Sequence, residues 1–151
     1  MKNINHLSPG FEFPETVIQV SEEEQRHKLS CCDIDGSIYG NEVDITMLGL
    51  PTLEILMAAD VPVLGAVHLF QKFHQHSPFV LGEAIIVNGK IREVLPHERG
   101  CILSCEFRYT DPMGNVRVEA QRSGIVPVGA KAKSHENFRP VSYTHLRAHE
   151  T

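Results

Sequence analysis

The chain has 151 residues, of which 42% are hydrophobic and 22% charged, and 14 Lys and Arg against 19 Asp and Glu give a formal charge of -5. This length suffices for one buried core and is short for two, so we expect a single domain. The negative charge and the scattered basic residues argue against nucleic acid as a partner. No apolar run approaches the roughly 18 residues of a membrane span, and the N-terminus lacks a signal-peptide layout, so we expect a cytoplasmic protein.

The first forty residues are predicted to contain two extended segments and a loop. Residues 13–20 end in β-branched side chains, and residues 25–32 form a second strand candidate after an acidic run at 22–24, interpreted as a solvated turn. Residues 33–40 are rich in Asp, Gly and Ser and have no apolar period, which indicates a loop. Loops held by a rigid scaffold often carry chemistry, so this segment is a candidate for the functional site.

Two helices are predicted in the middle of the chain. The first is short and covers residues 50–59, with Thr52 as its cap. Asp60 and Pro62 then mark the start of a longer helix that runs to about His74. The residues at helical spacing on it are Leu64, Val67 and His68, with Phe70 and Phe73 adding bulk. We therefore expect the longer helix to be largely buried.

The second half of the chain is predicted to form an antiparallel meander. Its strand candidates are residues 79–87, 90–95, 101–109 and 116–126. Asn88 and Gly89 are the favoured pair for a tight hairpin, and the Asp-Pro-Met-Gly string at 111–114 is strong turn chemistry. Strands, a buried helix and a meander together predict one α+β domain over residues 1–133, followed by a linker or fraying end at 134–140.

The four cysteines are Cys31, Cys32, Cys101 and Cys105, and none lies in a C-x-x-C string. On a strand, Cys101 and Cys105 would share one face but lie about 13 Å apart, too far for one metal ion. We interpret the cysteines as core thiols and expect no metal and no cofactor.

The last eleven residues, 141–151, resemble the translation of the transposon-end adapter used in shotgun sequencing libraries, residue for residue. On this interpretation the tail is not native, the chain is an environmental gene fragment, and its true C-terminus is missing. His145 and His149 are then excluded from any site. A native polar tail is the alternative.

Several short strings occur in a characteristic order along residues 26–127. They are Gly-Leu-Pro at 49–51 after an acidic loop, Gly65, the segment from Ser77 to Glu83, and a closing hairpin from Gly114 to Pro127. This order resembles the MaoC-like (R)-specific enoyl-thioester hydratases and 3-hydroxyacyl thioester dehydratases. The resemblance implies a hot-dog fold, in which an antiparallel sheet wraps around one long central helix. It also implies an acyl-CoA or acyl-carrier-protein thioester as ligand, and a homodimer or a second hot-dog domain as partner.

The family's catalytic loop has the form Asp-x-Asn-Pro-x-His, and its Asp and His handle a water molecule and the proton α to the thioester carbonyl. The corresponding stretch begins at Asp33, has Asp35 in the asparagine position, and has Ile38 or Tyr39 in the histidine position. The resemblance implies proton transfer by Asp33 with Asp35 or Tyr39. A tyrosine, with an unperturbed pKa of about 10, is a poor base at neutral pH but donates a hydrogen bond. A turn in which Asp35 caps its own backbone is the structural alternative.

Three further residues are site candidates on the predicted longer helix. His68 could replace the missing loop histidine, and a satisfied core histidine is the alternative. The family stabilises the enolate-like oxygen with backbone N–H groups at the start of the central helix, where Gly65 is expected to stand. Val67 and Phe70 would line the acyl pocket or belong to the core.

These residues leave three functions open. The first is a hydro-lyase, either an enoyl hydratase or a 3-hydroxyacyl thioester dehydratase. The second is the non-catalytic N-terminal acyl-binding half of a truncated double hot-dog protein, which the missing histidine favours. The third is a thioesterase on the same fold.

Overall fold

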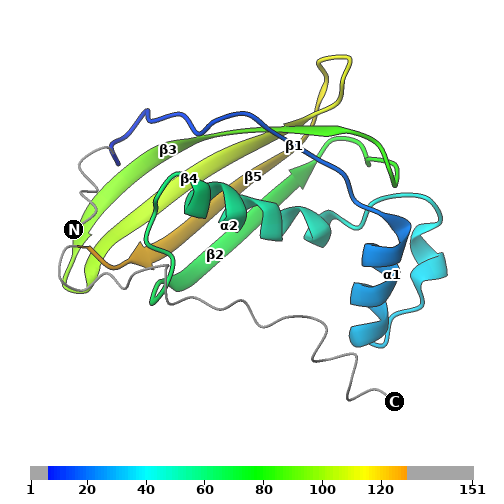
Figure 1. The fold of residues 1–151 in the computed structure, drawn as a ribbon, viewed down its shortest axis with the longest axis horizontal. Helices are drawn as coiled ribbons and strands as arrows, with labels where there is room; N and C mark the ends of the chain where they lie inside the picture. The colour runs from blue at the N-terminus through cyan, green and yellow to red at the C-terminus, as the bar shows by residue number, and fades with distance from the viewer. Residues whose placement is uncertain (1–6, 129–151) are drawn as a thin grey trace.

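The computed structural model describes residues 7–128, in which a five-stranded antiparallel sheet curls over one helix (Figure 1). The order across the sheet is β1-β3-β4-β5-β2. The strands are β1 Thr16–Ile18, β2 Val67–Gln75, β3 Ile85–His97, β4 Gly100–Thr110 and β5 Val116–Val126. The expected linker at 134–140 and tail at 141–151 lie outside the described residues.

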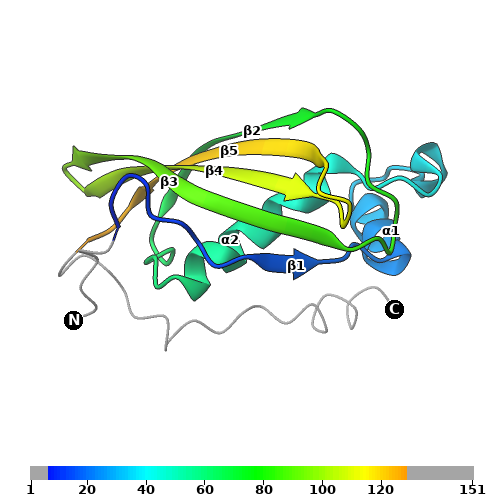
Figure 2. The same cartoon turned by 90° about the horizontal axis from the view of Figure 1, so that it is seen from above.

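Two α-helices and two short 3-10 helices precede β2. They are α1 Glu22–Cys31, η2 Gly36–Tyr39, η3 Ile45–Leu48 and α2 Gly49–Ala58. The view from above shows α2 on one side of the sheet and α1 beyond the end of α2 (Figure 2). The predicted α+β class and the sheet wrapped around a central helix are therefore confirmed.

The central helix is α2, so the helix predicted over residues 62–74 is wrong. Residues Val67–Gln75 form the edge strand β2, which pairs with β5. Asp60 (φ 60°) and Gly65 (φ 84°) both have left-handed backbone, which interrupts a helix before β2 begins. Pairing with a strand fifty residues later then overrides the helical spacing of the apolar side chains. As a result Phe70, expected to lie on a largely buried helix, is 49% exposed, and its neighbour Leu69 is 47% exposed.

The strand predicted over 25–32 and the turn predicted at 22–24 are also wrong, because both belong to α1. Ser21 caps this helix: its Oγ accepts a hydrogen bond from the Glu24 backbone N–H at 3.1 Å, and the Glu24 carboxylate accepts one from the Ser21 N–H at 3.4 Å. This is a capping box, and three glutamates in the first turn suit the positive end of the helix dipole. The acidic run therefore marks a helix start.

The predicted hairpin at Asn88 and Gly89 is absent, and both residues lie inside β3. A Cβ at Gly89 would meet the ring of Phe107 on β4 at 2.4 Å, and Phe13 stacks on the same ring with centroids 5.8 Å apart. The glycine makes room for an aromatic ring that crosses the strand. The turn after Asp111 is confirmed, since its Oδ1 accepts hydrogen bonds from two backbone N–H groups of that turn, each at 3.0 Å.

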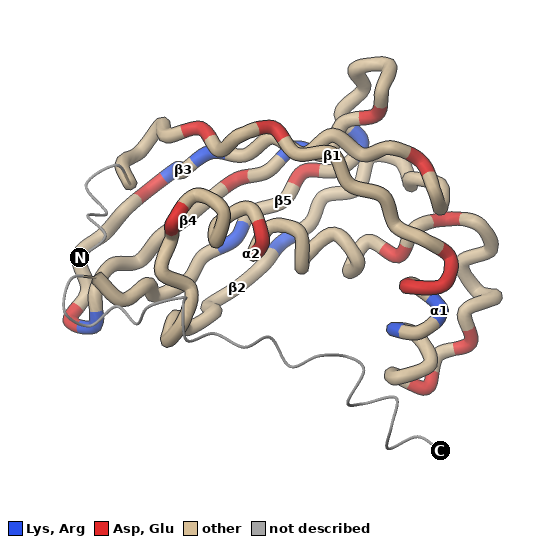
Figure 3. The backbone as a smooth tube through the Cα atoms, in the orientation of Figure 1, with Lys and Arg blue, Asp and Glu red and all other residues tan. Residues whose placement is uncertain are grey.

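The core lies between α2 and the inner face of β3, β4 and β5. Cys101 and Cys105 are buried there as predicted, whereas Cys31 and Cys32 are exposed at the end of α1, so the core assignment is wrong for that pair. Acidic positions gather around α1, whereas acidic and basic positions are interspersed along β3, β4 and β5 (Figure 3). No helix within residues 7–128 is long and apolar enough to cross a membrane.

Candidate functional site

The loop that resembles a catalytic loop joins α1 to η3. Asp33 follows α1 directly, is exposed, and has left-handed backbone with a φ of 56°. Its N–H donates to the carbonyl of Ser30 at 3.1 Å. Asp35 Oδ1 accepts a hydrogen bond from the Ser37 N–H at 2.9 Å and so caps η2. This bond holds the pKa of the Asp35 carboxyl below its usual value.

The histidine position of the loop is occupied by surface residues. Ile38 is 68% exposed. Tyr39 is half-exposed, ends η2, and accepts a hydrogen bond from the Glu42 N–H at 2.9 Å through its carbonyl. In both views the corner formed by α1 and η2 lies beyond the N-terminal end of α2 (Figures 1 and 2). The loop therefore faces the positive end of the central helix.

The first turn of α2 is anchored from the sheet rather than by a cap. Leu48 is the N-cap residue and makes no side-chain capping bond. Its carbonyl accepts a hydrogen bond from the Tyr109 hydroxyl at 2.6 Å, and burial raises the pKa of that phenol. Thr52, predicted as the cap, lies one turn inside and donates through Oγ1 to the carbonyl of Gly49 at 2.6 Å. These contacts fix the helix start against the inner face of the sheet.

A row of polar side chains crosses the inner face of the sheet beneath this turn. Arg122 on β5 is flanked by Gln71 on β2 and by Cys105 on β4. Arg122 Nη1 donates to Thr52 Oγ1 at 2.9 Å. Gln71 Nε2 is fully buried and has no hydrogen-bond partner within residues 7–128. A Cβ built on Gly49 would meet the Gln71 amide oxygen at 3.1 Å, so this amide lies directly below the helix start.

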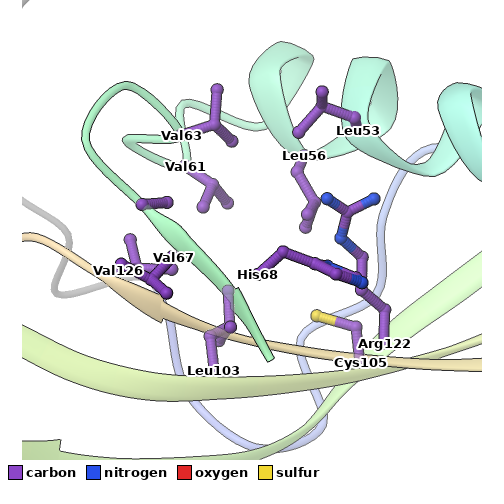
Figure 4. A pocket seen from close by; sticks show the side chains of 12 residues that line it. Leu53, Leu56, Val61, Val63, Val67, His68, Leu103, Cys105, Arg122 and Val126 are labelled. Atoms are coloured by element: carbon purple, nitrogen blue, oxygen red, sulfur yellow. The ribbon is translucent and has the colours of Figure 1, made fainter. Parts of the chain in front are cut away.

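A cavity of about 230 Å³ continues from Arg122 toward the C-terminal half of α2 (Figure 4). Its apolar wall includes Leu53, Leu56, Val61, Val63 and Val126. His68 enters it from β2, because the register between β2 and β5 shifts between His68 and Phe70. A β-bulge of this kind turns a side chain that regular alternation would direct elsewhere.

The electrostatics of this interior are dominated by Arg122. Burial lowers the pKa of its guanidinium, which nevertheless stays charged at neutral pH. Burial also raises the pKa of the Cys105 thiol to about 12, so this neighbour is neutral. Within residues 7–128 no ion pair joins Arg122 to a carboxylate, and Thr52 Oγ1 is its hydrogen-bond acceptor.

The predicted site residues fall into two groups. Asp33, Asp35 and Tyr39 share the loop, whereas His68 and Val67 line the cavity. The ten residues of α2 span about 15 Å, and most of that helix separates the two groups. His68 lies on a strand and is exposed, so its predicted place on a buried helical face is wrong.

Two further placements were wrong. Gly65 lies in the loop before β2, where its ideal Cβ position is 3.9 Å from Pro127, and Gly49 occupies the helix start expected for Gly65. Phe70 lies on exposed β2 and does not line the cavity described here.

Sequence reasoning missed Arg122 and Gln71. A readable signal was present for Arg122, because alternate residues of β5 form an inward apolar series that this arginine interrupts. The series is Val118, Ala120, Arg122, Gly124 and Val126. A charged residue at an inward position of a strand is rarely found without a partner or a role.

No family model and no curated protein matches the chain. Among solved structures, an (R)-hydratase from A. caviae involved in PHA biosynthesis shows 14% identity and a TM-score of 0.64 over 82% of this chain and 99% of its own. The C-terminally truncated HadBC complex, a 3R-hydroxyacyl-ACP dehydratase from Mycobacterium tuberculosis, shows 18% identity and a TM-score of 0.64. The match covers 78% of this chain and 96% of the HadBC chain. The chain has the hot-dog fold.

A longer solved protein matches over about half of its length. HtdX from Mycobacterium tuberculosis shows 17% identity and a TM-score of 0.62, over 83% of this chain and 51% of its own. The resemblance to MaoC-like proteins is thus confirmed at the level of the hot-dog fold.

Proposed function

We propose that this hot-dog chain binds a 2-enoyl or 3-hydroxyacyl thioester and serves its hydration or the reverse dehydration. The observation that carries the proposal is the buried Gln71 Nε2, which lacks an acceptor directly below the uncapped start of α2. Buried donors are nearly always satisfied, so an acceptor from outside the described residues, such as a ligand oxygen, would complete this amide. A thioester carbonyl oxygen at this point would satisfy the Gln71 amide and meet the positive end of the helix.

The helix start supplies the electrostatic part of the proposed reaction. Removing the proton from C2 of a 3-hydroxyacyl thioester places negative charge on the carbonyl oxygen, and the hydroxyl then leaves C3 as water. The Gly49 N–H donates to the Thr46 carbonyl, so the later N–H groups in the first turn of α2 would stabilise that charge, in the role expected for Gly65. They would do so without reorganisation, because Tyr109 and Thr52 hold this turn in place.

The loop supplies the proton-transfer part. We assign Asp33 to accept the C2 proton and Tyr39 to donate a hydrogen bond to the water or hydroxyl at C3. Asp35 positions both residues by capping η2. The place of this loop at the N-terminal end of α2 supports the assignment.

A second candidate function is an acyl-binding half that relies on another domain for catalysis. Exposed Ile38 at the histidine position and the match to half of HtdX favour it. In this case a partner hot-dog domain would supply an intact loop. The described part of β2 pairs on one side only, with β5, and therefore offers an open edge for such a partner.

The test is hydration of crotonyl-CoA by the full chain, monitored through the loss of the enoyl absorbance. Asp33→Asn is the informative variant, because Asn tolerates the left-handed backbone at this position whereas Ala would add strain. Glu15→Ala is the matched control, because Glu15 carries an exposed carboxylate directly before β1.

The hydro-lyase proposal predicts that Asp33→Asn lowers kcat about a hundredfold or more and that the control does not. Tight binding of the thioester without turnover would favour the acyl-binding half. A folded chain that neither binds nor hydrates the thioester would contradict both candidates.

A further inference from the structure

Arg122 places a fixed positive charge in a wall that is otherwise mostly aliphatic. It stands at one end of the cavity, and the valine side chains Val61, Val63 and Val126 form the opposite part of the lining (Figure 4). Four of its five guanidinium N–H donors have no acceptor within residues 7–128, since Nη1 alone donates there, to Thr52 Oγ1. The cavity is therefore amphipathic, with a cationic end and a hydrocarbon end.

The groups around Arg122 supply no negative charge. Cys105 and Tyr109 on β4 are buried and stay protonated, because burial raises the pKa of each. His68 enters from β2 and brings no carboxylate, and Gln71 adds a buried amide donor with no acceptor within residues 7–128. Thr52 on α2 is uncharged. Every described element packed against the guanidinium thus presents either a donor or a neutral group.

A partly desolvated guanidinium without a counter-ion is costly, and a ligand that carries the counter-ion removes that cost. A carboxylate matches the planar fork of arginine through two parallel hydrogen bonds, which a neutral carbonyl or a methyl group cannot do.

From this arrangement we infer that the cavity takes an acyl group that ends in a carboxylate, and that Arg122 binds this carboxylate. The inference rests on the proposed binding of acyl thioesters and names the class of acyl group. The bulge in β2 contributes by turning His68 into the same end of the cavity, where its ring N–H can donate to the same anion.

The test compares two thioesters of equal chain length, glutaryl-CoA and pentanoyl-CoA, by titration calorimetry with the full chain. We expect glutaryl-CoA to bind at least about tenfold more tightly, the factor typical of one hydrogen-bonded charge. Arg122→Met should abolish this preference, and Arg122→Lys should retain part of it. Arg99→Met, an exposed arginine in the turn between β3 and β4, is the matched control and should retain all of it.

A third ligand keeps the test independent of any variant that fails to fold. The CoA thioester of glutaric acid monoamide has the shape of the glutaryl group without its charge, and it should bind the unaltered chain no better than pentanoyl-CoA. Equal affinity for all three thioesters, or a preference that survives Arg122→Met, would overturn the inference and leave the proposed function standing. Failure of the folded chain to bind any of them would overturn both.

Discussion

The corner built from α1 and η2 and the interior beneath α2 are held together by different kinds of contact. The corner depends on hydrogen bonds between residues two or three apart, such as Ser21 with Glu24 and Asp35 with Ser37. The interior depends on contacts between distant segments, such as Tyr109 with Leu48 and Arg122 with Thr52. The proposed proton-transfer residue thus sits on locally determined structure, whereas the proposed acyl pocket depends on the whole fold.

The largest effect should come from overfilling the interior. Gly89→Val places a side chain where a Cβ alone would lie 2.4 Å from the Phe107 ring, so β3 and β4 must separate or the ring must leave its stack with Phe13. We expect a loss of about 3 kcal/mol in the free energy of unfolding, or failure to fold. Urea denaturation measures it. An unchanged midpoint would show that the sheet yields more easily than this packing implies.

A smaller effect should follow from removing one long-range hydrogen bond. Tyr109→Phe leaves the buried carbonyl of Leu48 without its hydroxyl donor at the start of α2. The expected loss is about 1–2 kcal/mol. Because the bond anchors the helix start, the variant should also weaken thioester binding, which calorimetry measures. A loss of stability with unchanged affinity would separate the anchor from the proposed carbonyl site.

A local contact in the corner should matter less. Ser21→Ala removes the cap of α1, and we expect a loss of about 1 kcal/mol in the local stability of that helix. Ser21→Asn keeps a capping acceptor and should restore most of it. Hydrogen exchange should show the loss confined to α1, with β4 and β5 amides unaffected; a general loss of protection would contradict the separation between the two regions.

The contact between Asp44 and Lys28, which joins α1 to the segment before α2, should make the stability of the protein depend on pH. Desolvation raises the pKa of buried Asp44, but hydrogen bonds from Thr46 and the charge of Lys28 on α1 outweigh it, so the net pKa is lowered. The stabilisation is therefore present above the unfolded value of about 3.9 and is lost as pH falls through the lower folded pKa. Asp44→Asn should flatten the acid limb of a stability–pH curve. An unchanged curve would place the acid sensitivity elsewhere.

The difference between the two regions also explains how far the sequence could be read. The helix at 50–59 and the last two strands carry local signals and agree with the structure, whereas the loop predicted at 33–40 contains the short 3-10 helix η2. The start of α1 was readable as well, since Ser21 and Glu24 have capping-box spacing, but the acidic run was interpreted as a turn. These elements need no knowledge of distant residues.

The remaining elements depend on partners far along the chain. Residues 67–75 satisfy helical spacing and become a strand only because β5 offers a pairing edge. The need for a glycine at position 89 becomes clear only when the ring of Phe107 on the neighbouring strand is known. The polar row across β2, β5 and β4 depends on the pairing registers of these three strands, so the sequence alone did not bring Gln71 and Arg122 together. The inward position of Arg122 was nevertheless visible as a charged residue in an otherwise apolar alternation.

The open edge of β2 links assembly to ligand exchange. Val67 and His68 belong to this edge strand and also line the cavity, so a partner strand paired with β2 would lie beside the cavity. A bound acyl group would then dissociate more slowly from the assembled protein than from a single chain. Its residence time would rise with protein concentration, and dilution alone would act as a release signal.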